Sequence, residues 1–385
     1  MRKKRNAIIL LICFVLFFSV LGARYMQTRP KNFSSVNLLE YNSSYNFYYT
    51  NLTKNAKIAY TLILNEIEEF PTEIEIPLLT EEEHGDLFLA LSYDHPDLLC
   101  FANESQMRIQ GVRAFFIPNY AMDQTLCKTR EKQLHDKVEE IYKHVTPTMS
   151  DYEIELLFHD YICKNTVYSD KSEGGYTAYD ALLQGHAVCE GYARAMQLLL
   201  QRAGIPSYLV TGSSRRPNSD DIEGHMWNVV RIGGQNYYLD VTWDDMNISG
   251  FNTVQHTYFN LTESEIVKDH KDIKPMDNDC TATVYNYFIR NQSYFSQYNT
   301  QTKDKIVSLL QDSIRHQNYQ IEIRFSDTST YQEALRDLTK NGEILHLLRK
   351  ADLSASKKYK KITYSYADEF RTIQFILPEK EIKNG

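Results

Sequence analysis

The sequence lacks most of the features that would direct it toward nucleic acids, nucleotides or metals. Its 42 Lys and Arg are outnumbered by 50 Asp and Glu, and no basic stripe alternates with aromatic residues, which argues against nucleic acid as a partner. It has no Cys-x-x-Cys pair and no Cys/His cluster at metal-ligand spacing, which argues against zinc. It has no glycine-rich phosphate loop and no internal repeat. We therefore expect no metal and no other cofactor.

Long hydrophobic runs are also absent, with one exception at the N-terminus. Basic residues at 2–5 precede an apolar stretch over 7–21. Because basic residues stay on the cytoplasmic side of a membrane, we expect the chain after this stretch to be exported. The stretch is short for a membrane span, which needs roughly 20 residues, and it also fits the core of a signal peptide. Since Gly22 and Ala23 make poor cleavage sites, the sequence favours a single-pass anchor over 1–25 at the cell membrane, with secretion after cleavage as the alternative.

The six cysteines are Cys13, Cys100, Cys127, Cys163, Cys189 and Cys280. Cys13 lies in the apolar stretch, which leaves five in the exported part of the chain. Because five is odd, at least one of them is unpaired unless two chains cross-link. Apart from Cys189, which is discussed below, the other four form two disulfides or remain buried thiols, and the sequence leaves both possibilities open.

A chain of 385 residues is long enough for two or three domains, and composition and periodicity suggest where they begin and end. Residues 26–54 are polar, show no apolar period and are typical of a stalk. We assign 55–150 to an N-terminal region of helices and strands, 151–288 to a core domain, and 289–385 to a small α/β domain. Because 289–385 carries none of the candidate catalytic residues, we expect the reactivity of the core not to depend on it.

Apolar periodicity and the positions of Gly and Pro predict the individual elements. Helices are predicted over 55–70, 80–93, 123–145, 151–164, 187–203, 303–316 and 331–350. Strands are predicted over 73–79, 108–118, 207–212, 225–232, 237–243, 319–325, 361–366 and 371–377.

Cys189 lies where a loop enters the predicted helix 187–203. A thiol in the first turn of a helix meets the positive end of the helix dipole, which favours the thiolate. Gly191 removes a side chain next to the sulfur, and we interpret this as room for a substrate backbone. The N–H groups of the first turn are free donors and suit an oxyanion. Considered alone, however, a cysteine beside Val188 is more often a small buried apolar residue.

His225 and Asp240 fall on the two strands of a predicted hairpin with its turn at 233–234. A two-residue turn pairs Trp227 with Asp240, and since alternate residues share a face, His225 and Asp240 project to the same side. Such diagonal neighbours lie roughly 7–8 Å apart at the backbone, a gap that a carboxylate–imidazole hydrogen bond can close. A strand-end histidine and a surface carboxylate are the simpler alternatives. The pair nevertheless fits a base and its orienting group, and Cys189 completes a nucleophile–base–orienter set.

Four stretches of the sequence together resemble a known family. They are Thr177-Ala-Tyr-Asp-Ala-Leu-Leu-Gln-Gly-His-Ala-Val-Cys189-Glu-Gly-Tyr-Ala, Gly204-Ile-Pro, Gly224-His225-Met-Trp-Asn-Val-Val and Tyr238-Leu-Asp240-Val-Thr-Trp-Asp-Asp245. They closely resemble bacterial transglutaminase-like proteins, whose superfamily shares its core and its Cys–His–Asp order with animal transglutaminases and, more distantly, with papain-type proteases. The downstream pair Asp269-His270 also resembles these proteins, and so, more loosely, does the upstream stretch His159-Asp-Tyr. The resemblance covers about 55–288 and implies an α+β, papain-like core with flanking α/β segments, in which a cysteine-bearing helix packs on an antiparallel sheet.

By this resemblance, Cys189 is the nucleophile, His225 is the general base and acid, and Asp240 holds the imidazole. The thiolate would attack a glutamine carboxamide or a peptide carbonyl, and an amine or water would then resolve the thioester. Trp227 and Tyr179 are candidates for lining the site or helping an oxyanion hole, with simple packing as the alternative for each.

Two classes of function follow from the resemblance. The first is an enzyme that acts by acyl transfer or amide hydrolysis on a protein or peptide of the cell envelope. The second is a non-catalytic binding or scaffolding module that keeps the transglutaminase fold. The intact Cys–His–Asp set favours the enzyme, while the choice between transfer and hydrolysis stays open because it depends on whether water or an amine reaches the thioester.

Overall fold

The computed structural model describes most of the chain beyond its N-terminus. The described residues are 31–39, 45–102, 104–169, 174–215, 221–245, 253–276, 278–352 and 362–377. The anchor that the sequence predicts over 1–25 lies outside these ranges, and within them no helix is both long enough and apolar enough to cross a membrane. The chain divides into two compact units, Met1–Lys132 and Gln133–Gly385.

The N-terminal unit contains a three-stranded antiparallel sheet with its strands in the order β1, β3, β2. Helix α4 begins at a capping box, in which the side chains of Thr80 and Glu83 each accept from the other's backbone N–H. The fully buried Tyr60, Leu91 and Phe116 belong to the apolar cluster of this unit. The elements are α2 (Phe47–Thr50), α3 (Lys54–Glu66), a 3-10 turn (Ile67–Glu69), β1 (Ile74–Ile76), α4 (Glu81–Asp94), β2 (Gln106–Gln110), β3 (Arg113–Ile117) and the start of α5 (Gln124–Tyr142).

Two sequence predictions are wrong in this unit. The single strand predicted over 108–118 is a hairpin of β2 and β3, because Gly111 adopts a φ of +64° and allows the chain to turn. The stalk predicted over 26–54 folds into the unit at its C-terminal end. Tyr49 of α2 is buried there, and its backbone N–H donates to Asp94 Oδ2 at 2.7 Å. A segment this short buries too few residues to show an apolar period.

The cysteines divide between the two possibilities that the sequence left open. Cys100 and Cys127 form a disulfide in the N-terminal unit, with their Cα atoms 5.6 Å apart. Cys163 and Cys280 are buried free thiols, and Cys189 is a partly exposed free thiol.

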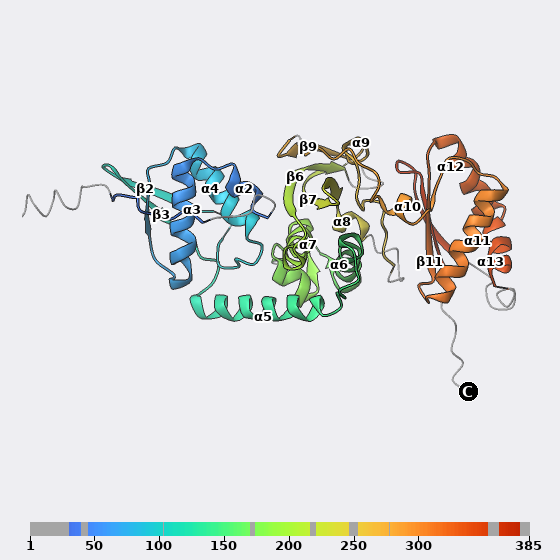
Figure 1. The fold of residues 1–385 in the computed structure, drawn as a ribbon, viewed down its shortest axis with the longest axis horizontal. Coiled ribbons are helices and arrows are strands. Elements are labelled where there is room, and N and C mark those ends of the chain that lie inside the picture. Colours follow the sequence, from blue (N-terminus) through green and yellow to red (C-terminus); the bar gives the residue numbers. More distant parts are fainter. Residues whose placement is uncertain are drawn as a thin grey trace, which may run out of the picture. The chain divides into compact units, whose positions relative to one another are not determined.

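The core of the second unit is a four-stranded antiparallel sheet in the order β8, β7, β6, β9. Helix α7 packs against β6 and β7, and α6 packs beside α7 (Figure 1). Asn228 of β7 is fully buried and donates its Nδ2–H to the carbonyl oxygen of Ala193 in α7 at 3.0 Å. The elements are α6 (Asp151–Asn165), β4 (Val167–Tyr168), a π-helical turn (Asp180–Gln184), β5 (His186–Ala187), α7 (Cys189–Ala203), β6 (Ser207–Arg215), β7 (Ile222–Ile232), β8 (Gln235–Leu239), α8 (Val241–Asp244), α9 (Glu263–Ile266), β9 (His270–Lys274) and α10 (Tyr287–Arg290). The predicted cysteine-bearing helix packed on an antiparallel sheet is confirmed.

The hairpin of β7 and β8 has the predicted register. Val229 pairs with Tyr238, and the two glycines at 233–234 make the turn with φ values of +58° and +80°. The prediction is wrong beyond Leu239, because β8 ends there and the residues expected to continue the strand form α8. Asp240 therefore stands between a strand and a helix.

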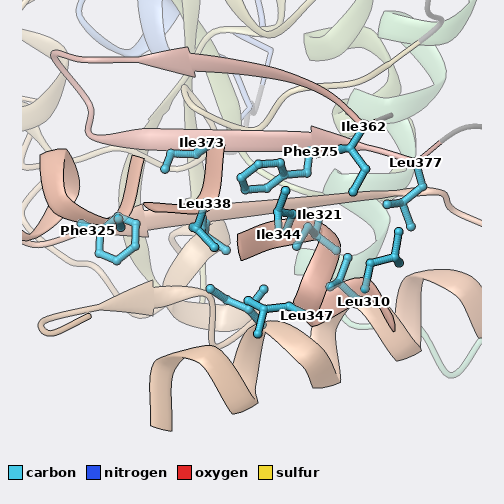
Figure 2. Packing of buried hydrophobic residues seen from close by; sticks show 14 of the residues in the cluster. Leu310, Ile321, Phe325, Leu338, Ile344, Leu347, Ile362, Ile373, Phe375 and Leu377 are labelled. Atoms are coloured by element: carbon cyan, nitrogen blue, oxygen red, sulfur yellow. The ribbon is translucent and has the colours of Figure 1, made fainter. Parts of the chain in front are cut away.

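A second four-stranded sheet, in the order β10, β11, β13, β12, completes this unit toward the C-terminus. Apolar side chains of the helices, such as Leu310 and Leu347, meet those of the strands, such as Ile321 and Phe375 (Figure 2). The single helix predicted over 331–350 is wrong, because Gly342 adopts a φ of +75° and separates two helices. The elements are β10 (Tyr294–Phe295), α11 (Thr300–Arg315), β11 (Gln320–Phe325), α12 (Thr328–Leu335), a π-helical turn (Arg336–Lys340), α13 (Glu343–Ala351), β12 (Thr363–Ala367) and β13 (Thr372–Ile376).

Candidate active site

The structure brings His225 and Asp240 into direct contact. His225 Nε2 lies 2.7 Å from Asp240 Oδ2, and the Asp240 side chain has no exposed surface. The other oxygen of Asp240 caps α8, since Oδ1 accepts from the backbone N–H of Thr242 at 3.0 Å and of Trp243 at 3.2 Å. The carboxylate is thus held by the start of a helix while it faces the imidazole.

Both members of this pair are charged at neutral pH. Burial alone would lower the pKa of His225, but the charge and hydrogen bond of Asp240, with a smaller contribution from Cys189, raise it to about 10. Burial alone would raise the pKa of Asp240, but the charge and hydrogen bond of His225 and a hydrogen bond from His270 lower it to about 2. An imidazolium held by a buried carboxylate is the form that stabilises a neighbouring thiolate.

Cys189 supplies the third group. It is the first residue of α7, it is partly exposed, and it lies near enough to His225 to add to the rise in the pKa of that imidazole. Because His225 Nε2 faces Asp240, Nδ1 is the ring nitrogen left for the sulfur. The two other free cysteines have different surroundings, since burial raises the pKa of Cys163 to about 11 and also raises the pKa of Cys280. Cys189 is therefore the one free thiol among the described residues that combines partial exposure with a histidine and a buried carboxylate.

The first turn of α7 offers donors for an oxyanion. Val188, the residue before the helix, has a side chain that accepts no hydrogen bond from the N–H groups of the first turn. Our interpretation of Gly191 as space for a substrate is wrong. A Cβ at this position would lie 2.4 Å from the carbonyl oxygen of Gly175 and 3.1 Å from that of Thr177. The missing side chain makes room for the protein's own backbone.

Trp227 and Tyr179 both occupy packed positions. The Trp227 ring is 1% exposed and stacks on the His225 ring, with centroids 5.6 Å apart and planes at 22°. Tyr179 is also buried, and its hydroxyl donates to Gln133 Oε1 at 2.9 Å. Both residues were candidates for lining the site or for packing, and their burial favours packing. Trp227 packs directly on the His225 imidazole.

Sequence reasoning assigned no role to His270, which lies against the candidate triad. His270 Nε2 is 3.0 Å from the same Asp240 oxygen that binds His225, and its Nδ1 is 2.7 Å from Asp269 Oδ1. The motif Asp269-His270 was visible in the sequence. Its position was not, because β9 joins the sheet by pairing with β6 and not with a neighbour in sequence.

A second buried network of histidines and carboxylates lies in the same unit. His256 Nε2 is 2.9 Å from Asp160 Oδ1, and His159 Nδ1 is 3.2 Å from the same oxygen. Their other ring nitrogens face Glu322 Oε1 at 2.7 Å and Asp244 Oδ2 at 3.2 Å. Within the described ranges, His159, Asp160 and His256 have a metal-like spacing, as do His225, Asp240 and His270. Ion pairing accounts for both groups, and the absence of a metal stays a prediction.

Comparison with known proteins identifies the domain. Residues 138–243 match the model of the transglutaminase-like superfamily, and this segment contains Cys189, His225 and Asp240. The chain thus contains a segment that matches the transglutaminase-like superfamily, which confirms the resemblance seen in the motifs. A search of curated protein sequences found no match.

Several solved structures are similar to part of the chain. A putative cysteine protease from Cytophaga hutchinsonii is 18% identical over 36% of this chain and 61% of its own, with a TM-score of 0.25. A structure described as a TGase is 13% identical over 49% of this chain and 54% of its own, with a TM-score of 0.27. The periplasmic domain of TgpA from Pseudomonas aeruginosa, bound to ethylmercury, is 14% identical over 44% of this chain and 71% of its own, with a TM-score of 0.22. The chain thus spans less than two thirds of the first two of these proteins.

Proposed function

We propose that the protein is a transglutaminase-like thiol enzyme that transfers or hydrolyses the acyl group of a glutamine side chain or a peptide bond. The observation that carries the proposal is the contact of His225 with the wholly buried Asp240, beside the partly exposed residue Cys189. A purely structural histidine needs neither a buried carboxylate on one side nor an accessible thiol on the other. A cysteine nucleophile needs a histidine as its base, and that histidine needs a carboxylate that orients its ring.

The proposed reaction has two halves. The Cys189 thiolate attacks the carbonyl carbon, and the negative charge that develops on oxygen is stabilised by the N–H groups of the first turn of α7. The His225 imidazolium then donates its proton to the departing nitrogen, which leaves a thioester and a neutral imidazole. In the second half, His225 removes a proton from an incoming amine or water, the thioester breaks and the thiolate returns. Asp240 stays ionised throughout and holds the ring.

We also propose that the catalytic domain works outside the cytoplasm, anchored by the apolar stretch over 7–21, on protein or peptide substrates of the cell envelope. The basic residues before this stretch support that orientation. The disulfide between Cys100 and Cys127 supports it independently, since disulfides persist in oxidising compartments. A phosphatase reporter fused after Gly385 should be active in cells. An inactive phosphatase with an active cytoplasmic reporter at the same position would reject export.

The test of the proposed activity is the relative reactivity of the free thiols. The purified chain is pulsed with iodoacetamide at mildly acidic pH, and peptide mapping by mass spectrometry measures labelling at Cys189, Cys163 and Cys280. We expect Cys189 to react at least tenfold faster than either buried thiol. His225→Ala should remove most of this advantage, because the thiolate loses its cationic partner.

Trapping with cell-envelope extract would then identify the acyl group carried by Cys189. Equal labelling of the three cysteines in folded protein would reject the enzyme and favour the binding module instead.

A further inference from the structure

Asp240 is shared by two histidines. Its Oδ2 atom lies 2.7 Å from His225 Nε2 and 3.0 Å from His270 Nε2, while Oδ1 accepts from the backbone N–H groups of Thr242 and Trp243. All four contacts are buried or nearly so. The carboxylate is therefore held from two sides, by the two histidines at Oδ2 and by the start of α8 at Oδ1.

His270 is itself fixed from behind. Its Nδ1 lies 2.7 Å from Asp269 Oδ1, and Asp269 Oδ2 accepts from the Tyr258 hydroxyl at 2.6 Å. The Asp240 backbone N–H donates to the Tyr258 carbonyl at 3.2 Å, so the chain of contacts returns to its starting residue. Burial alone would lower the pKa of His270, but because both ring nitrogens face carboxylates, the hydrogen bonds to Asp240 and Asp269 raise it and favour the cationic ring.

We propose that His270 is a positioning residue for the Cys189–His225 pair, acting through the carboxylate of Asp240. This inference rests on the proposed function. It assigns His270 two tasks, which are to hold Asp240 Oδ2 in line with the His225 ring and to share the negative charge of that carboxylate.

The second task has a measurable consequence. The groups that face the His270 ring are Asp240, Asp269, the His225 ring at 5.4 Å and the Tyr258 ring at 5.9 Å between centroids, and the uncharged rings of Trp227 and Trp243. A positive His270 attracts the charge of Asp240 and repels a proton on His225. Its removal should therefore strengthen the hold of Asp240 on that proton, and the imidazolium of His225 should persist to higher pH.

The experiment measures the rate of Cys189 alkylation against pH in the purified full chain. The upper inflection of this profile reports loss of the proton from His225. In His270→Gln, whose Nε2 keeps a donor near Asp240 but carries no charge, we expect this inflection to rise by about one pH unit. In His270→Phe, which keeps the ring but loses both donors, we expect a several-fold lower rate across the profile because Asp240 is no longer held.

Asp269→Asn provides a second route to the same result. It leaves the His270 ring in place but removes one of the carboxylates that keep it charged, so the upper inflection should again rise. An upper inflection that stays at the wild-type pH in both folded variants would overturn the positioning role, because a merely structural histidine would lower stability without moving the profile. That outcome differs from failure of the proposed function, in which wild-type Cys189 itself would label no faster than Cys163 and Cys280.

Discussion

Gly191 lies directly against the carbonyl oxygen of Gly175. A Cβ at position 191 would come within 2.4 Å of that oxygen and within 2.8 Å of the Ala187 Cβ, both shorter than real contacts allow. The backbone N–H of Val188 donates to the same Gly175 oxygen at 3.0 Å. The loop at 174–177 is thus pressed onto the start of α7, and the glycine fixes where Cys189 begins the helix.

Gly191→Ala should therefore displace the first turn of α7. We expect a loss of stability of roughly 1–3 kcal/mol, as for other overpacked sites, together with a strong decrease in Cys189 alkylation. Thermal or denaturant unfolding and pulse labelling would measure the two effects. Gly85→Ala in α4 is the matched control, because nothing lies within 4 Å of a Cβ there, and we expect it to be neutral or slightly stabilising. Full reactivity of Cys189 in Gly191→Ala would contradict this account.

The candidate triad was predictable because its determinants are local. Cys189 was found from the start of a helix, and His225 and Asp240 from the register of one hairpin, in which the turn at 233–234 fixes every pair. His270 was beyond reach, because its neighbours in space come from strands and loops distant in sequence. The glycine at 191 was interpreted wrongly because the space beside it is occupied by the carbonyl oxygens of Gly175 and Thr177, and a π-helical turn and β5 separate these residues from α7.

Errors in the secondary structure also have local physical causes. The strand predicted to continue through Trp243 ends at Leu239 because the Asp240 side chain accepts from the N–H groups of Thr242 and Trp243 and starts α8. The apolar spacing of the sequence continues through 331–350, although Gly342 adopts a positive φ and separates two helices there. Periodicity detects buried faces more reliably than it detects the ends of elements.

Stability should fall as the solution becomes alkaline. The pKa of His225 is raised to about 10, and that of His256 to about 9 because the charges of Glu322 and Asp160 outweigh burial. Since these values exceed the unfolded value of about 6.5, the stabilisation is fully present below pH 6.5 and is lost as the pH rises through 9 to 10. The midpoint of denaturant unfolding should decrease steadily from pH 7 to pH 10. A midpoint that does not change over this range would argue against charged histidines in the core.

Glu155 should contribute to the same decline through a separate route. It is wholly buried, and its Oε2 accepts from Asn260 Nδ2 at 2.8 Å, while burial raises the pKa of the carboxyl group to about 8. The protonated form is favoured in the folded state, so stability is lost as the pH rises from about 4.5 through 8. Glu155→Gln keeps the shape without the charge. We expect it to match the wild type at pH 5 and to exceed it in unfolding midpoint at pH 8.5, and the opposite order at pH 8.5 would refute the assignment.

The C-terminal sheet contacts the core through β11, while the expectation that the reactivity of the core does not depend on 289–385 stays a prediction. Glu322 of β11 accepts from both His256 Nδ1 and the His256 backbone N–H, at 2.7 and 2.9 Å. Arg324, on the same strand, donates to the Thr257 carbonyl at 2.6 Å. Thr257 is followed by Tyr258, whose hydroxyl donates to Asp269 behind His270. The C-terminal sheet therefore supports the loop that carries Tyr258 and its contact with Asp269.

Glu322→Gln should test that support. The substitution leaves the His256 imidazolium without one of its two carboxylates in a site where both side chains are 3% exposed, and breaking a buried pair of this kind costs about 3–5 kcal/mol. We expect lower stability and slower alkylation of Cys189 at neutral pH. Glu369→Gln is the matched control, because Glu369 pairs with Arg215 where the two side chains are 50% and 42% exposed, and its loss should change stability by less than about 1 kcal/mol. If the two variants label Cys189 at the same rate as the wild type, the C-terminal sheet stabilises only itself, and the contacts of His256 do not reach the site.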